Sequence, residues 1–445
     1  MRGADPFSTI PAPLLLGIVK LLPDLATLYS LDKASPAVAS LLEECGAEII
    51  EAIMPAALSE DTRNVTRVVA VIRSGFLFSR SLSEFIDTYI CRKRACKSSC
   101  QIRESPMRIR QTAGQRPQED CELYDERLPL PKLASSTSSK VLREILKLAF
   151  QIQCLMGFCL QTMIDRCMAL EPSHLLNPHF RYMNRPFGEP CPQRRPQGQR
   201  YQPQNAGPPM WIEQERVHQA IWRVILFFDL MAAATKSELN WPSEDVTHIL
   251  SSNPEALWEK SSVGSQQEHI KTIIEFTQEQ IAIYSPGATF PDFLEVLPRL
   301  PCAERFIWAY ETVPQPLNPS VVDETWIDRP SSGWVFASGT LQHDPKSPAK
   351  NCDLRTFRRL GLFIWSIKRL AMLGLFNYFQ GYELPGSPPH LSTDNKWFTW
   401  ESILSREEIE DQERWRISQF PEPQREFGSA KKETYWYMAV YKGSR

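Results

Sequence analysis

Residues 10–35 read IPAPLLLGIVKLLPDLATLYSLDKAS, and this stretch decides the architecture of the N-terminal part of the chain. It predicts two short helices on either side of Pro23 and Asp24, both with leucine or isoleucine at helical spacing. Helices this short bury too little apolar surface on each other to be stable alone. Their apolar side chains must therefore pack against the rest of the chain or against a partner. These side chains are Leu14, Ile18, Leu21, Leu22, Leu25, Leu28 and Leu31.

The starts of these helices are marked by residues that cap helices. Asp24 is a typical N-cap, and Ser35 followed by Pro36 combines an N-cap with a proline at the first helical position. The sequence therefore predicts three short helices over residues 12–22, 24–34 and 36–45.

The order of these features resembles an F-box motif. An apolar residue and proline precede an amphipathic helix, a break at Pro23 and Asp24, and regularly spaced leucines. F-box motifs form a helical hook that docks onto the Skp-type adaptor of cullin-RING ubiquitin ligases, so the resemblance implies such an adaptor as a partner. Pro13 stands where the family usually has an acidic residue, and the late tryptophan of the motif is absent. The positions that match the adaptor-binding face are Ile10, Pro11, Leu14, Leu15, Ile18, Leu21 and Leu22.

Two later segments extend the resemblance. Residues 213–223 read EQERVHQAIWR and are similar to a helix of uncharacterised filamentous-fungal F-box-like proteins. Residues 354–370 resemble a segment further along the same proteins. Neither carries a catalytic signature, so the resemblance implies a helical region that binds a client protein of unknown identity. Arg223 lies among apolar neighbours and is expected to meet a carboxylate, because an unpaired buried charge is costly.

Helix signals continue along the chain. Ser59 precedes a helix that stops at Gly75, and Ser81 with Glu84 forms a capping box at the start of another. A longer and more evenly apolar helix is predicted over residues 139–170, as the centre of the fold. Further helices are expected over residues 211–235, 266–284, 353–380 and 405–420.

Strand signals are sparse, with residues 434–441 the best candidate and residues 334–336 a weaker one. Residues 171–210 are rich in proline and predict a flexible insertion, whereas residues 285–350 combine proline with large aromatics and predict a long loop packed on the core. The predicted fold is mostly α: a three-helix F-box-like hook followed by a large irregular helical domain with proline-rich loops. The predicted domains are 1–55 for the F-box-like motif and 56–445 for the helical domain.

The composition excludes several functions. The chain has 36 prolines but only 19 glycines, and neither G-x-G-x-x-G nor a P-loop occurs, so the nucleotide sites built on these motifs are not expected. The formal net charge of -2 gives no general attraction to nucleic acid or to anionic membranes.

The most apolar stretches, residues 148–160 and 361–379, are interrupted by polar or charged side chains and do not predict a membrane span. The eleven cysteines and an N-terminus without an apolar leader indicate an intracellular protein of the cytoplasm or nucleus. No cofactor is predicted.

Catalytic and metal sites are not predicted either. Four thiols that lie close in sequence could hold zinc, but their spacing contains no C-x-x-C pair, so metal binding there is left open. The basic run in residues 91–116 is interpreted as a solvated loop, because no aromatic residues alternate with it. The seven histidines are scattered, and no catalytic residue is assigned. The four thiols are Cys91, Cys96, Cys100 and Cys121.

These patterns lead to one function and one alternative. We expect a non-catalytic interaction protein, the substrate-receptor subunit of an SCF-type ubiquitin ligase, whose N-terminal helices bind the adaptor and whose helical domain binds a client. The alternative is a structural or scaffold protein in which the F-box-like helices pack intramolecularly. The exposure of Leu14, Ile18 and Leu21 discriminates between them, because intramolecular packing would bury all three side chains.

Overall fold

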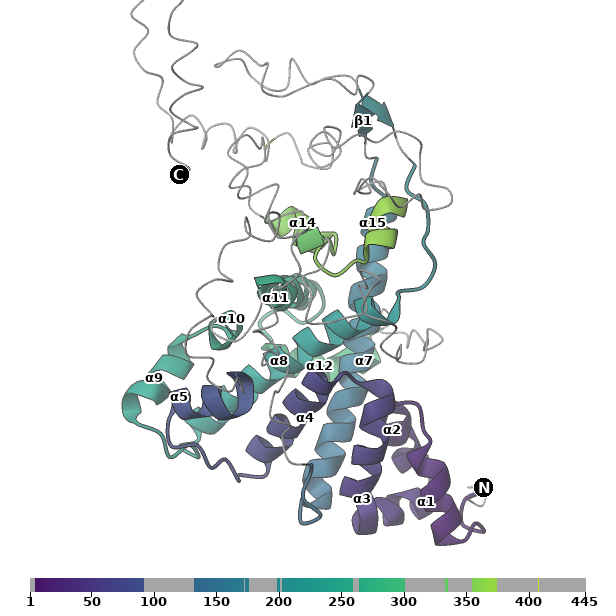
Figure 1. Cartoon of the computed structure of the whole chain (residues 1–445), viewed down its shortest axis with the longest axis vertical. Helices are drawn as coiled ribbons and strands as arrows, with labels where there is room; N and C mark the ends of the chain where they lie inside the picture. Colours follow the sequence, from purple (N-terminus) through teal and green to yellow (C-terminus); the bar gives the residue numbers. More distant parts are fainter. Residues whose placement is uncertain are drawn as a thin grey trace, which may run out of the picture.

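The structure, a computed structural model, confirms a mostly helical fold in which short N-terminal helices precede longer ones (Figure 1). It describes residues 5–91, 132–171, 173–175, 198–200, 202–258, 264–300, 333–334, 354–373 and 407. The predicted helix over 405–420, apart from Glu407, and the predicted strand over 434–441 lie outside the described residues.

Three helices form the N-terminal hook: α1 (Ala12–Lys20), α2 (Leu25–Ala34) and α3 (Pro36–Ala57). Both predicted caps are present, because Asp24 Oδ1 accepts from the amide of Thr27 at 2.6 Å and Ser35 Oγ accepts from the amide of Val38 at 3.2 Å. The third helix is longer than predicted. It changes direction at Cys45, where the predicted helix ended, and then continues.

The helices that follow the hook begin where the sequence places their caps. α4 (Glu60–Arg73) starts at Ser59, whose hydroxyl accepts from the amide of Thr62, and it ends before Gly75, whose φ is +69°. α5 (Leu82–Phe85) starts at Ser81 and continues as a π-helical turn, η1 (Ile86–Cys91).

Three long helices form the centre of the fold: α7 (Ser139–Met168), α8 (Trp211–Thr235) and α11 (Gly264–Tyr284). They match the predicted ranges closely. α2 packs on α7, while α4 and α11 pack on α8. By length and composition, α7 and α8 could each cross a membrane, but 78% and 72% of their most apolar windows are buried in the protein interior. Core packing therefore accounts for their apolar composition.

Shorter elements complete the described structure. α9 (Ser243–Ser251) and α10 (Pro254–Leu257) lead into α11, and α12 (Phe290–Val296) continues into a 3-10 turn, η6 (Leu297–Arg299). Most of the predicted insertion over 171–210 lies outside the described residues. Within it, β1 (Ser173–Leu175) pairs antiparallel with β2 (Gly198–Arg200), and His174 lies opposite Gln199.

The predicted helix over 353–380 is wrong where the structure describes it. The chain forms two short helices instead, α14 (Arg355–Arg359) and α15 (Ile367–Met372). Gly361, at a φ of +72°, ends α14. Its amide donates to the carbonyl of Arg358, and the next amide, that of Leu362, donates to Phe357. These two bonds form the turn that commonly closes a helix at glycine. Trp334, predicted to lie in a weak strand, is helical.

Candidate functional site

The outer face of α1 carries an exposed apolar stripe. Leu14, Ile18 and Leu21 lie at positions i, i+4 and i+7, so their side chains project from one side of the helix. Their exposed fractions are 63%, 47% and 85%. Pro11, just before the helix, is exposed as well. We call these four residues the α1 stripe.

A second stripe on α1 faces the protein interior. Leu15 and Val19 are buried in the core, and Ile10 and Leu22 are half-buried against it. The structure therefore divides the predicted adaptor-binding set between two neighbouring faces. Pro11, Leu14, Ile18 and Leu21 face outward, whereas Ile10, Leu15 and Leu22 anchor the helix.

Asp5 holds the start of the hook in place, a role that the sequence analysis missed. Its carboxylate accepts from the hydroxyl of Ser35 at 2.8 Å and from the amides of Ala37 at 3.1 Å and Phe7 at 2.9 Å. Desolvation acts to raise the pKa of Asp5, but these hydrogen bonds outweigh it and lower the pKa below its ordinary value. The segment before α1 is thereby tied to the junction of α2 and α3.

Pro13 is compatible with this hook. It lies in the first turn of α1, where the missing amide hydrogen costs no intrahelical hydrogen bond. At the other end of α1, Lys20 pairs with Glu48 of α3. The α1 stripe is thus presented by a helix that is held at both ends, and it is made of apolar side chains in contact with solvent.

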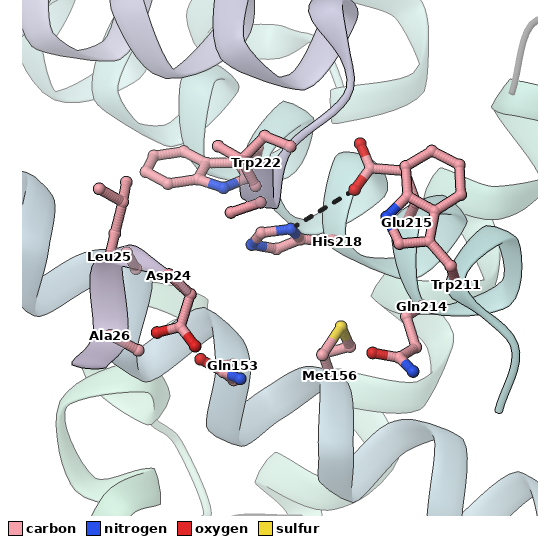
Figure 2. A pocket seen from close by; sticks show the side chains of 13 residues that line it. Asp24, Leu25, Ala26, Gln153, Met156, Trp211, Gln214, Glu215, His218 and Trp222 are labelled. Carbon is pink, nitrogen blue, oxygen red and sulfur yellow. Dashed lines mark ion pairs between the residues drawn. The ribbon is translucent and has the colours of Figure 1, made fainter. Parts of the chain in front are cut away.

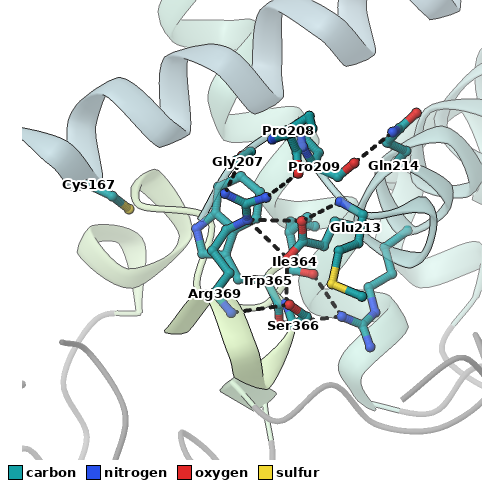
Figure 3. A network of polar contacts seen from close by, with 12 residues as sticks. Cys167, Gly207, Pro208, Pro209, Glu213, Gln214, Ile364, Trp365, Ser366 and Arg369 are labelled. Carbon is teal, nitrogen blue, oxygen red and sulfur yellow. Dashed lines mark hydrogen bonds and ion pairs between the residues drawn. The ribbon is translucent and has the colours of Figure 1, made fainter. Parts of the chain in front are cut away.

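Residues of the segments 213–223 and 354–370 lie against each other (Figure 3). Glu213, at the start of α8, accepts from Arg369 Nε at 3.0 Å and from the amide of Ser366 at 2.9 Å. Arg369 also donates to the carbonyls of Gly207 and Pro208, at 3.1 and 2.8 Å. Both side chains of this ion pair are almost fully buried. We interpret this network as structural, because its hydrogen bonds join α15 and the residue before it to the start of α8 and to the segment that precedes α8.

Arg223, which the sequence places among apolar neighbours, contacts Gln266 and Trp258. Its Nη1 donates to the side-chain oxygen of Gln266 at 3.0 Å, and its guanidinium lies over the ring of Trp258, 4.7 Å from the centroid. A cation over an indole face is a favourable contact. These contacts join α8 to the first turn of α11 and to Trp258 at the end of α10.

A cleft of about 290 Å³ lies between α4, α7, α8 and α12. Arg73 makes two hydrogen bonds to Asp229 there, at 2.7 and 3.0 Å, and Lys147 pairs with Glu295. Burial raises the pKa of Asp229 despite the neighbouring guanidinium. Since these two carboxylates are paired with cations of the chain itself, we assign no ligand to the cleft.

Two buried thiols of α7, Cys159 and Cys167, are poor nucleophiles. Burial raises the pKa of Cys167 to about 12 and also raises that of Cys159, so both stay protonated at neutral pH. Cys167 donates to the carbonyl of Leu360. Among the residues that the structure describes, no three histidine, cysteine or acidic side chains are placed to hold a metal ion.

Part of the predicted chemistry falls on residues that the structure leaves undescribed. Cys96, Cys100 and Cys121 lie outside the described residues, as does the basic run after Cys91. Compared with models of known protein families, with curated proteins and with solved structures, the chain matches none of them. What the fold and this site define is a mostly helical protein whose first helix carries an exposed apolar stripe.

Proposed function

We propose that this chain is a non-catalytic interaction protein, the substrate-receptor subunit of an SCF-type ubiquitin ligase. In this role the α1 stripe binds a Skp-type adaptor, and the helical region that follows binds a client protein. Ubiquitin transfer is carried out by other subunits of the ligase. The resemblance of residues 10–35 to an F-box motif supplies the identity of the adaptor.

The observation that carries the proposal is the exposure of Leu14, Ile18 and Leu21. An apolar stripe on a surface helix gains free energy when a partner removes it from water, at about 25 cal/mol per Å². The inner stripe and the contacts of Asp5 hold the helix rigid before binding. A rigid helix loses little conformational entropy when it docks, which favours affinity.

The alternative, a scaffold protein with an internally packed F-box-like segment, requires these three side chains to be covered by the chain itself. They are covered neither by α2 and α3 nor by any other described segment, since each keeps close to half or more of its surface in contact with solvent. This observation favours a partner-binding role.

A pull-down of the full-length protein with a purified Skp-type adaptor tests the proposal. Wild type should retain the adaptor, and Leu14→Asp and Ile18→Asp should each reduce the retained amount by about tenfold or more, because the new charge would be desolvated in the interface. Both positions face solvent, so the free protein should tolerate these changes.

Ile283→Asp is the matched control, because Ile283 is a similarly exposed apolar residue on α11 (60% exposed). It should leave adaptor binding unchanged. Failure of wild type to retain the adaptor would overturn the adaptor role, and an equal loss with Ile283→Asp would remove the α1 stripe as the binding surface.

A further inference from the structure

A small cavity lies where the hook meets the later helices (Figure 2). Its walls come from the start of α2, the end of α3, and the facing sides of α7 and α8. Its volume is about 30 Å³, which admits about one or two water molecules and excludes larger ligands. The polar side chains that line it are Asp24, Gln153, Gln214, Glu215 and His218.

Trp222 places an unpartnered donor at this cavity. The side chain is fully buried, and no atom of the described part of the chain accepts a hydrogen bond from its indole Nε1. Figure 2 shows this nitrogen on the side of the ring that faces His218 and Asp24. Buried indole N–H groups normally find an acceptor, because a buried donor without one is costly.

His218 supplies an acceptor across the same space. Its Nδ1 lies 3.8 Å from Glu215 Oε2, so the tautomer with its proton on Nδ1 directs that proton toward the carboxylate and offers Nε2 as an acceptor. The second ring nitrogen is turned toward Trp222 and Asp24 (Figure 2). Glu215 is itself positioned by α4, since its Oε1 accepts from the hydroxyl of Thr62 at 2.6 Å and from the amide of Ser59 at 3.1 Å.

We propose that this cavity binds an ordered water molecule. The water accepts a hydrogen bond from Trp222 Nε1 and donates its two hydrogens to His218 Nε2 and to the carboxylate of Asp24. A site with one donor and two acceptors around a volume of this size satisfies the hydrogen-bonding capacity that an internal water requires. The water thereby joins α8 to Asp24, the N-cap of α2, and fixes the base of the hook whose outer face carries the α1 stripe.

A crystal structure of the full-length protein at a resolution that shows ordered solvent tests the proposal directly. We expect a density peak in the cavity, within hydrogen-bond distance of Trp222 Nε1 and of His218 Nε2. A cavity without density, or with density out of reach of Nε1, would overturn the proposal.

The stability of Trp222→Phe provides a second test, with Trp241→Phe as the matched control. Trp241 is also buried, and its Nε1 donates to the carbonyl of Ser79 at 2.9 Å, so Trp241→Phe removes a hydrogen bond with a known partner. If water accepts from Trp222, both variants should lower the thermal midpoint by a similar number of degrees.

If the N–H of Trp222 were unpartnered, Trp222→Phe would lower the midpoint clearly less than Trp241→Phe, because only the packing loss that both variants share would remain, and that result would contradict the proposal. If Trp222→Phe fails to fold, the density in the wild-type crystal decides. This test is independent of the adaptor pull-down, because the water site lies on the inner side of the hook.

Discussion

His269 shows how a single buried side chain ties stability to pH. It lies on α11, is 2% exposed, and its Nε2 is 2.9 Å from the carbonyl oxygen of Phe363. Because a carbonyl can only accept, Nε2 must carry the proton. Burial is the largest influence on the ring and, together with the nearby charges of Arg216 and Arg223, lowers its pKa well below the ordinary value. The folded protein therefore holds this histidine neutral.

The lowered pKa predicts acid sensitivity. An unfolded chain takes up a proton at this position below about pH 6.5, whereas the folded chain does not. The stability that His269 contributes is therefore complete above that pH and is lost as the pH falls toward the folded pKa. His269→Gln keeps a donor for the carbonyl of Phe363 and removes the titration. We expect the free energy of unfolding to fall less steeply between pH 7 and pH 5 in this variant than in wild type.

Urea unfolding at several pH values measures the difference, whose upper limit is about 1.4 kcal/mol per pH unit. His248→Gln is the control, because His248 is an exposed residue of α9. Identical pH slopes for wild type and His269→Gln would show that this histidine does not control the acid response.

At the scale of elements, the sequence predicted helix starts well, because capping is local. Asp24, Ser35 and Ser59 each accept a hydrogen bond from an amide three residues further along. The break at Gly361 was missed because the surrounding residues are apolar and suit a helix. Contacts with other helices determine where this helix breaks. The carbonyl of Ile364 accepts a hydrogen bond from Arg216 of α8, which replaces a bond that a continuous helix would make.

The turn at Gly361 can be tested by adding a side chain to it. A side chain there would adopt a φ of +72°, and its Cβ would lie 2.8 Å from Met163 Sδ of α7 and 2.9 Å from the ring of Trp365. Gly361→Ala should therefore destabilise the protein both by backbone strain, about 1–3 kcal/mol, and by the close contacts.

Gly287→Ala isolates the backbone contribution. Gly287 also has a positive φ, +84°, but a Cβ built there meets nothing within 4 Å. The difference between the two variants in the free energy of unfolding measures the packing of the turn against α7. If both variants lose the same free energy of unfolding, the turn at Gly361 can move away from α7 at no cost, and packing against α7 does not determine its conformation.

The candidate site was predictable in part. Helical spacing identified the apolar residues of α1, but it could not predict which of them are buried. Leu14 and Leu15 are the same residue type at neighbouring positions, and only packing in the fold exposes Leu14 and buries Leu15. The contact of Glu213 with Arg369 was beyond sequence reasoning for a related cause. Glu213 and Arg369 belong to the two later segments, residues 213–223 and 354–370, but they lie 156 positions apart in the sequence. Only the folded chain brings such residues together.

The hook and the later helices share one hydrophobic core, and this continuity sets how the whole molecule unfolds. Buried side chains of α1, α2 and α3 belong to the same apolar cluster as those of α7, α8 and α11. Leu28 of α2 is fully buried in it, and α2 packs on α7. Removal of this side chain should therefore weaken the entire fold rather than release the hook alone.

Leu28→Ala should cost about 2–5 kcal/mol, the range for a buried leucine. The test follows two probes through urea unfolding. The tryptophans all belong to residues after the hook and report chiefly on those residues, because residues 1–57 contain none. Cys45, half-buried at the bend of α3, reports on the hook through thiol labelling resolved by peptide mass analysis. Both midpoints should move to lower urea by the same amount, as expected for one cooperative unit.

Ile273→Ala completes the comparison from the opposite side of the core, because Ile273 is a fully buried residue of α11. It should also shift both probes together. If Leu28→Ala moves only the Cys45 midpoint while Ile273→Ala moves only the tryptophan midpoint, the hook unfolds independently. The α1 stripe would then be carried by a separable unit, and rigid presentation of that stripe could not contribute to adaptor affinity.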